Sequence, residues 1–246
     1  GDSGTWNLFS LIGYTNVSTS LDHHYAYRLS FGSTAHDDYL YSKPFTVTDG
    51  VNDAVSFRFL SPNSTYPEMI DVLVVHDDFT TTIIADDLEP DAHEWKFYSF
   101  LYDLSAYEGE DIRIAFHSTT TDEDLAALDN VVVGAYSDME NGWAGFTYGD
   151  SSYGEAENWY SGTVPSGDVV ISETTDSAAE DASIESAVSL SSLEVESSAS
   201  LTVAKNGSLT LSGDLTSSGT TTIQSDSNEF GVLIVQGSAT GDVTYN

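Results

Sequence analysis

Acidic side chains are the groups in this sequence with the clearest capacity for chemistry. Adjacent pairs occur at 37–38, 77–78 and 86–87, in segments that we expect to be loops. Carboxylate oxygens on loops, together with backbone carbonyls, are the ligands that Ca²⁺ prefers. Five acids fall near the ends of expected strands: Asp37, Asp38, Asp122, Asp124 and Asp129. The pattern indicates a structural calcium ion, although the sequence has no EF-hand loop.

Catalytic chemistry has little support in the sequence. It contains no G-x-S-x-G, no H-E-x-x-H and no Gly-rich phosphate loop. The only adjacent histidines are His23 and His24, which would point to opposite faces of a strand, so an exposed polar loop explains them better than a zinc site. With 40 acids in the chain, neighbouring carboxylates arise by chance. We therefore expect the protein not to be an enzyme.

Aromatic side chains could bind carbohydrate, because a ring face packs against the apolar side of a sugar while nearby polar groups bind its hydroxyls. The possible platforms are Trp6, Tyr14, Tyr25, Tyr41, Tyr66 and Trp95. Aromatic residues on the strands of a β-sandwich more often belong to the core. Tyr66, in the proline-flanked segment SPNSTYPEM, is the least expected in a core. We take Tyr66, Trp6 and Tyr25 as the predicted ligand-binding residues.

The charge of the chain limits its partners. Six Lys and Arg residues against 40 Asp and Glu residues give a formal charge of −34. Nucleic acid is excluded as a partner because phosphate binding needs clustered Lys and Arg, and an anionic membrane surface is disfavoured for the same reason. No apolar run approaches the roughly 20 residues of a membrane span, so we expect no membrane insertion. Such a charge suggests high ionic strength or bound cations.

The elements that must position these groups are strands. Alternating apolar and polar residues predict strands at 25–31, 39–48, 54–60, 70–76, 80–85, 94–104, 111–117 and 125–133, with a possible opening strand near Trp6. Residues 106–109 form an expected turn in which Gly109 can take a left-handed conformation. No segment has a convincing helical period. The first part of the chain is therefore predicted to be an all-β domain with about nine strands.

The composition changes after residue 136. Residues 1–136 hold 23 acidic and 5 basic residues, whereas residues 161–246 contain Lys205 as their only basic residue and Phe230 and Tyr245 as their only aromatic residues. A 22-residue spacing relates Ile171, Leu193 and Leu215, then Leu201, Ile223 and Tyr245, and then Leu211 and Leu233. A fixed period near 20 residues is typical of a solenoid with stacked parallel rungs. We predict two domains, at 1–136 and 137–246, and the alternative for the second is a disordered Ser/Thr-rich linker.

Four motifs in the first domain resemble one family. HDDYLYSKPFTV, AVSFRFLS, IDVLVVHDD and DLSAYEGEDIRIAFHSTTTD followed by ALDNVVV occur in the order seen in the choice-of-anchor J, or cleaved-adhesin, domain of secreted bacterial proteins. That resemblance covers residues 29–136, with Tyr39 where the family usually has Trp. It implies a jelly-roll β-sandwich related to MAM and galactose-binding modules. It also implies a structural calcium between an early loop and the final strand, with Asp38 and Asp129 as the leading ligands and Asp37 next; a backbone-bonding turn role for Asp129 is equally compatible.

The second part of the chain also has a resemblance. The segment AENWYSGTVPSGDVVIS and the Ser/Thr/Gly-rich tract after it look like the short β-helix of secreted Bacteroidetes proteins, which usually lies between a surface module and further domains. Trp143, Phe146 and Trp159 would then form an apolar plug over the first rung. The tripeptide at 176–178 matches the short O-glycosylation pattern of that group, so Ser177 is a predicted glycan site.

These observations lead to one functional expectation and one alternative. We expect an extracellular or cell-surface, non-catalytic module that binds polysaccharide or a cell-surface glycan, or that mediates adhesion, within a larger secreted protein. The chain begins Gly-Asp-Ser, without a Met or a signal peptide, which suggests a mature or excised piece. The alternative is a structural spacer or fibre subunit that assembles through the ends of the β-helix.

Overall fold

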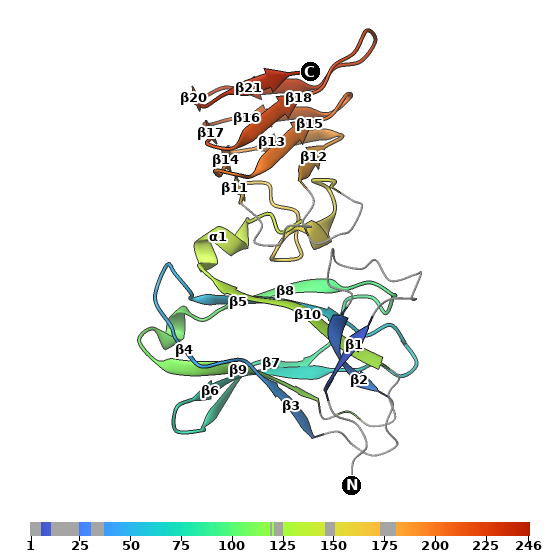
Figure 1. The fold of residues 1–246 in the computed structure, drawn as a ribbon, viewed down its shortest axis with the longest axis vertical. Helices are drawn as coiled ribbons and strands as arrows, with labels where there is room; N and C mark the ends of the chain where they lie inside the picture. The colour runs from blue at the N-terminus through green and yellow to red at the C-terminus, as the bar shows by residue number, and fades with distance from the viewer. Residues whose placement is uncertain are drawn as a thin grey trace. The chain divides into compact units, whose positions relative to one another are not determined.

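The protein is nearly all-β and divides into two compact units. The computed structural model describes residues 6–10, 25–30, 37–118, 120, 125–145, 151–172 and 181–246 (Figure 1). The first unit, which we call the sandwich unit, ends at Tyr136, and the second, the solenoid unit, begins at Ser137. Among the described residues, no helix has the length and apolar character needed to cross a bilayer.

Two antiparallel sheets form the two layers of the sandwich unit (Figure 1). The strands of the first sheet, in spatial order, are β1 (Asn7–Ser10), β2 (Tyr25–Ser30), β10 (Leu125–Gly134), β5 (Ala54–Leu60) and β8 (Tyr98–Asp103). Those of the second sheet are β3 (Asp38–Tyr41), β9 (Asp111–Ser118), β6 (Ile70–His76) and β7 (Thr81–Leu88), and β4 (Phe45–Thr46) also pairs with β9. The predicted all-β sandwich is therefore confirmed.

The core of the sandwich unit consists of the alternate residues of strands from both sheets. Phe57 and Phe59 of β5 pack in one cluster with Ile112, Ile114 and Phe116 of β9, and all five are at most 2% exposed. Phe57 contacts Phe116 edge-on, with 4.9 Å between the ring centroids. Burial of this apolar surface is the main force that holds the two sheets together.

The local predictions need adjustment in several places. The strand expected over 39–48 is split into β3 and β4, because Pro44 has no N–H to donate to a ladder. The expected turn at 106–109 contains a 3₁₀ helix, η1 (Ser105–Tyr107), before Gly109, whose φ is 81°. One short α-helix, α1 (Tyr136–Glu140), follows β10 although no helical period was found, because five residues are too few to show one.

Parallel strands stack into three sheets in the solenoid unit (Figure 1). The first contains β11 (Asp168–Ile171), β14 (Ser192–Val195), β17 (Leu215–Ser217) and β20 (Ala239–Thr240). The second contains β12 (Ala182–Ile184), β15 (Ser200–Val203), β18 (Thr220–Ile223) and β21 (Val243–Tyr245), and the third β13 (Ala187–Leu190), β16 (Ser208–Leu211) and β19 (Val232–Val235). A parallel β-solenoid of about three turns is confirmed.

The predicted 22-residue alignment is correct for two pairs of residues. Leu193 lies opposite Leu215, and Ile223 lies opposite Tyr245. Both Leu193 and Leu215 are buried inside the solenoid.

The other predicted alignments are wrong by two residues. Ile171 pairs with Val195, Leu201 with Thr221, and Leu211 with Val235. The cause is unequal rung length: Val169 to Leu193 spans 24 residues, whereas Leu201 to Thr221 spans 20. A shift of two residues keeps the same face of the strand inward, so the apolar pattern conceals it.

An aromatic cap covers the first rung of the solenoid, as predicted for Trp143 and Trp159. Their rings meet edge-on with centroids 5.1 Å apart, and both are packed in the solenoid core. Tyr153 joins them, 4.9 Å from Trp159, and its hydroxyl donates to the carbonyl of Pro165. The predicted third member, Phe146, lies outside the described residues. Backbone hydrogen bonds from Trp143 to Val170 and from Tyr153 to Ser183 also engage the outer edge of this rung.

Candidate functional site

The outer face of the β3–β9–β6–β7 sheet carries aromatic, acidic and imidazole side chains close together. Residues that alternate with the core positions make up a separate apolar cluster, formed by Leu73, Val75 and Ala115. The strand register places Tyr41 across from Ala115. It also places Tyr39 across from His117, which is in turn across from Asp71. We call the surface formed by Tyr39, Tyr41, Asp37, Asp71 and His117 the tyrosine face.

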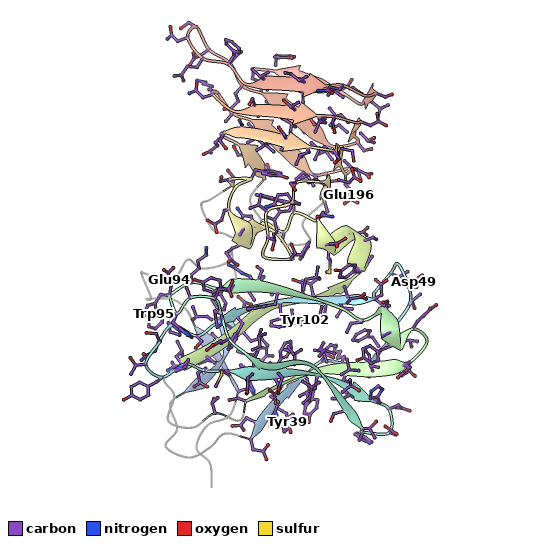
Figure 2. All side chains as sticks on the ribbon, turned by 180° about the vertical axis from the view of Figure 1, so that it is seen from behind. Tyr39, Asp49, Glu94, Trp95, Tyr102 and Glu196 are labelled. Atoms are coloured by element: carbon purple, nitrogen blue, oxygen red, sulfur yellow. The ribbon has the colours of Figure 1, made fainter. Side chains whose placement is uncertain are left out.

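The two tyrosines of this face lie side by side and are open to solvent. Tyr39 is 41% and Tyr41 52% exposed, and their rings are stacked with 5.6 Å between centroids. Figure 2 shows Tyr39 on the side of its sheet away from the core, whereas Tyr102 of β8 points between the sheets. Residues two apart on one strand share a face, so the sequence Tyr-Leu-Tyr places both rings outward and Leu40 inward. The result is an exposed aromatic surface on a regular sheet.

His117 fixes the position of Tyr39. The two rings are stacked with 3.9 Å between centroids and 9° between their planes. His117 Nε2 lies 3.0 Å from Asp37 Oδ1, and Nδ1 lies 3.5 Å from Asp71 Oδ2. Because one carboxylate approaches each nitrogen, the imidazole plane is held in one orientation and supports the tyrosine ring.

The surroundings of the Tyr39 hydroxyl favour its neutral form. Partial burial raises the pKa of this phenol, and the negative charges of Asp37 and Asp71 raise it further, together with Tyr41. A neutral phenol can both donate and accept a hydrogen bond. The tyrosine face therefore offers a hydroxyl group and carboxylate oxygens beside exposed rings.

Asp71 also belongs to the acidic group that lies closest together. Among the described residues, Asp71, Asp86 and Asp87 form the group of three whose possible ligand atoms are all within 4.8 Å of one another. Asp71 Oδ1 accepts a hydrogen bond from the backbone N–H of Asp87, at 3.1 Å. Exposed acidic groups of this kind are common without an ion, so the grouping alone does not assign a metal.

The predicted calcium ligands lie on two different sheets. Asp37 precedes β3 and contacts His117, and Asp38 opens β3, where its carbonyl accepts a hydrogen bond from the Trp6 indole. Asp129 lies in β10, opposite Arg58, and its Oδ1 accepts a hydrogen bond from the backbone N–H of Asn130. The carboxylate oxygens of these three residues do not all lie within 4.8 Å of one another. Calcium binding through them stays a prediction.

The predicted aromatic platforms have different surroundings. Trp6 is half-buried against the main core of the sandwich unit, which favours a packing role. Tyr66 is 49% exposed in the loop between β5 and β6, as expected for a residue outside the core. Tyr25 lies in β2, but its side chain is outside the described part of the structure, as is all of Ser177.

The sequence analysis names Tyr41 among the possible aromatic platforms, but it predicts neither Tyr39 nor His117 as a ligand-binding residue. The usable signal was the alternation of residues 39–41, which puts two tyrosines on one face of a strand. The partnership with His117 and Asp71 has no local signal, because it depends on how β3, β9 and β6 pair.

Comparison with known proteins gives structural similarity without a sequence match. No protein-family model and no curated protein sequence matches the chain. One similar structure is TmCBM61 in complex with β-1,4-galactotriose, with 13% identity and a TM-score of 0.34 over 47% of this chain and 74% of that one. Another is the K3 cleaved-adhesin domain of Lys-gingipain from Porphyromonas gingivalis W83, with 12% identity and a TM-score of 0.34 over 53% of this chain and 91% of that one.

A catalytic domain is also among the similar structures. The catalytic domain of a GH87 α-1,3-glucanase in complex with nigerose has 10% identity and a TM-score of 0.34, covering 91% of this chain but 48% of that one. At these identities and TM-scores the similarities assign no function to this chain.

Proposed function

We propose that the protein is a non-catalytic carbohydrate-binding module of an extracellular or cell-surface protein, and that a polysaccharide binds on the tyrosine face. The observation that carries this proposal is the pair of exposed, stacked tyrosines flanked by Asp37, Asp71 and His117 on one sheet. Aromatic rings pack against the apolar C–H face of a sugar. Carboxylates and a phenol then bind its hydroxyls.

The charge of the protein selects among glycans. A chain with a formal charge of −34 repels uronic-acid and sulfated polymers. Adhesion to a glycan-coated surface uses the same contacts, so neutral polysaccharides and cell-surface glycans form one ligand class in this proposal. The solenoid unit would then separate the binding unit from further domains of a larger secreted protein.

The test is binding of the whole chain to a panel of neutral and acidic polysaccharides, by affinity electrophoresis and calorimetry. Tyr41→Ala should weaken binding of the preferred glycan by about three- to tenfold, since one aromatic contact contributes about 0.7–1.4 kcal/mol. Tyr245→Ala is the matched control, because this tyrosine is 70% exposed in the solenoid unit. Tyr66→Ala separates the tyrosine face from the loop aromatic. Equal losses from Tyr41→Ala and Tyr245→Ala, or no glycan bound at all, would contradict the proposal.

Absence of catalysis is tested in the same samples. The preferred glycan, incubated with a large excess of protein, should release no reducing ends over a day. Glycan cleavage that Asp71→Asn abolishes would instead indicate an enzyme that uses a carboxylate of the tyrosine face.

A structural spacer is the second candidate, and the solenoid favours it. Three ladders of parallel strands form a regular stack, of the kind that repeat proteins use for extension. For assembly into fibres through the solenoid ends, the cap would have to move, because its backbone already bonds to Val170 and Ser183 of the first rung. Sedimentation of the whole chain distinguishes the two forms of this candidate: a spacer stays monomeric at all concentrations, whereas a fibre subunit grows into long oligomers.

A further inference from the structure

A hollow opens at one end of the β3–β9–β6–β7 sheet, outside the tyrosine face. Its volume is about 320 Å³, at the lower end of the range for small-ligand pockets. The lining residues come from β4 and the residue before it, the end of β6 and the residue after it, and the start of β9. They are Pro44, Phe45, Thr46, Val75, His76, Asp77, Asp111, Ile112 and Arg113. The lining thus combines apolar, basic, acidic and hydroxyl side chains.

The hollow continues the outer surface that carries the tyrosines. Arg113 lies opposite Val75, two residues along their strands from Ala115 and Leu73. Val75 belongs to the same outer cluster as Leu73 and Ala115, and Ala115 lies opposite Tyr41. Arg113 and Val75 are therefore the next row of side chains after the row that contains Tyr41.

Most polar groups of the hollow are held in place by neighbours within the protein. The Thr46 hydroxyl donates a hydrogen bond to the Asp111 carboxylate. His76 lies between Glu110 and Thr82, with Nδ1 2.8 Å from Glu110 Oε2 and Nε2 3.0 Å from Thr82 Oγ1. Side chains that are already ordered lose little conformational entropy when a ligand binds.

Asp77 and Arg113 keep most of their hydrogen-bonding capacity for a ligand. Asp77 is exposed and makes no hydrogen bond among the described residues. Arg113 donates one long bond, 3.5 Å from Nη1 to the carbonyl of Ser42, which leaves most of its five N–H groups available. A second hollow of about 530 Å³ shares His76, Asp77 and Asp111 with the first, so Asp77 is accessible from both.

We propose that this hollow is a second subsite for the glycan of the tyrosine face, and that it binds one neutral sugar unit through vicinal hydroxyls. Arg113 donates to one hydroxyl and Asp77 accepts from its neighbour, while the exposed ring of Pro44 contacts the apolar side of the sugar. A hydroxyl both donates and accepts, so a vicinal pair satisfies a cation and a carboxylate at once. An anionic sugar is excluded because Asp77, Asp111 and the nearby Glu110 would repel it. This inference rests on the proposed carbohydrate-binding function.

The test is calorimetry with the neutral oligosaccharide that the whole chain binds best, using Asp77→Asn and Arg113→Gln. Each change removes hydrogen bonds to a charged group, so each should weaken binding by about tenfold or more. Glu94→Gln is the matched control because it also removes an exposed charge, but far from the hollow. Asp49 closely follows β4, which lines the hollow, and Glu94 lies at the opposite end of the sandwich unit from Asp49 (Figure 2). Thermal melts check that all three variants fold.

The length of the ligand provides a second readout. If the hollow and the tyrosine face bind one chain, the Asp77→Asn penalty should appear only with oligosaccharides long enough to reach both. Short fragments held by the tyrosines should bind the variant and the wild type equally.

The outcomes separate this inference from the proposed function. Loss of binding in Tyr41→Ala but wild-type binding in both hollow variants would overturn the subsite and leave the tyrosine face standing. Loss in the hollow variants with wild-type binding in Tyr41→Ala would overturn the proposed site and the shared-chain subsite together. Losses in all three variants, with the predicted dependence on length, support both.

Discussion

At the scale of single residues, the turn between β6 and β7 contains an unusual phenylalanine. Phe79 has φ of 65° and is 81% exposed, so neither its backbone conformation nor its environment suits an aromatic L-residue. The turn is closed by hydrogen bonds between His76 and Thr80 and from Phe79 N–H to the His76 carbonyl. Glycine is the usual residue at such a left-handed position in a hairpin. The phenyl ring is therefore retained at a cost in stability.

Phe79→Gly should raise the stability of the sandwich unit by about 1 kcal/mol, because glycine removes the left-handed penalty of an L-residue. Phe79→Ala is the control, since it removes the ring but keeps the Cβ atom that causes the strain. Chemical denaturation would measure both. A stabilisation of equal size in the two variants would attribute the effect to the exposed ring and not to the backbone.

Asp53 is the second residue whose chemistry bears on stability. Its carboxylate accepts hydrogen bonds from the backbone N–H groups of Gly50, at 2.9 Å, and Tyr136, at 2.7 Å. These bonds lower the pKa of Asp53, which is 5% exposed. The Asp53 carboxylate thereby links the turn before β5 to Tyr136, the first residue of α1.

The sign of the resulting pH dependence is fixed by that lowered pKa. Asp53 contributes fully to the free energy of unfolding above the pKa that it has in the unfolded chain, near 3.9. That contribution is lost as the pH falls through its lower pKa in the folded protein. Asp53→Asn should reduce stability at pH 7 by about 1 kcal/mol and flatten the acid limb below pH 4. Exposed Asp91→Asn serves as the control. An unchanged acid limb in Asp53→Asn would assign acid unfolding to other carboxylates.

At the scale of elements, the solenoid depends on which face of each short strand points inward. Leu215 is 1% exposed between Leu193 and Ala239, whereas its neighbour Thr216 is exposed. Leu215→Asp should destabilise the solenoid by several kcal/mol because it buries an unpaired charge. Thr216→Asp adds the same charge one residue later and should be tolerated. Equal effects on the melting of the solenoid unit would refute the observed register.

At the scale of the whole molecule, the two units have separate apolar cores. We predict that they unfold in two independent transitions. Leu215→Asp should lower the melting temperature of the solenoid unit alone. Phe57→Ala opens a cavity in the sandwich core, so it should reduce the stability of the sandwich unit alone, by about 3–5 kcal/mol. Calorimetry of the whole chain measures both transitions. A shift of both by either variant would show that the units unfold together.

The charge of the whole molecule leads to the prediction about calcium. Residues 1–136 carry 23 acids against 5 bases, and a divalent ion relieves that repulsion more strongly than a monovalent one. At 100 times its dissociation constant, calcium would stabilise the sandwich unit by about 2.7 kcal/mol. We expect millimolar calcium to raise its melting temperature above that in sodium chloride of equal ionic strength.

Substitutions then locate the ion. Asp129→Ala should abolish the calcium effect, whereas Asp242→Asn, in the solenoid unit, should leave it unchanged. Because Asp87 lies beside Asp71 and Asp86, Asp87→Ala tests this second acidic group separately. A melting temperature that depends only on ionic strength would show that these acids bind no calcium and are only solvated surface groups.

The sequence by itself determined the local properties of this protein. Period-two alternation predicted the strands of the sandwich, because a half-buried strand must place apolar residues on one face. Leucine, isoleucine and valine at rung spacing predicted the solenoid, because each rung can bury its apolar residues only against the next. Trp143 and Trp159 before the first rung predicted the cap for a similar reason: the first strand edge needs a cover.

Only the tertiary structure decided which distant residues meet. The solenoid register differs from a constant 22-residue period because the turns absorb different numbers of residues, and a shift of two leaves the apolar pattern intact. Tyr39, Asp71 and His117 come from three strands and form one surface because β9 pairs with both β3 and β6. Interstrand hydrogen bonds and the packing of two sheets set that pairing, and neither leaves a periodic signal in the chain.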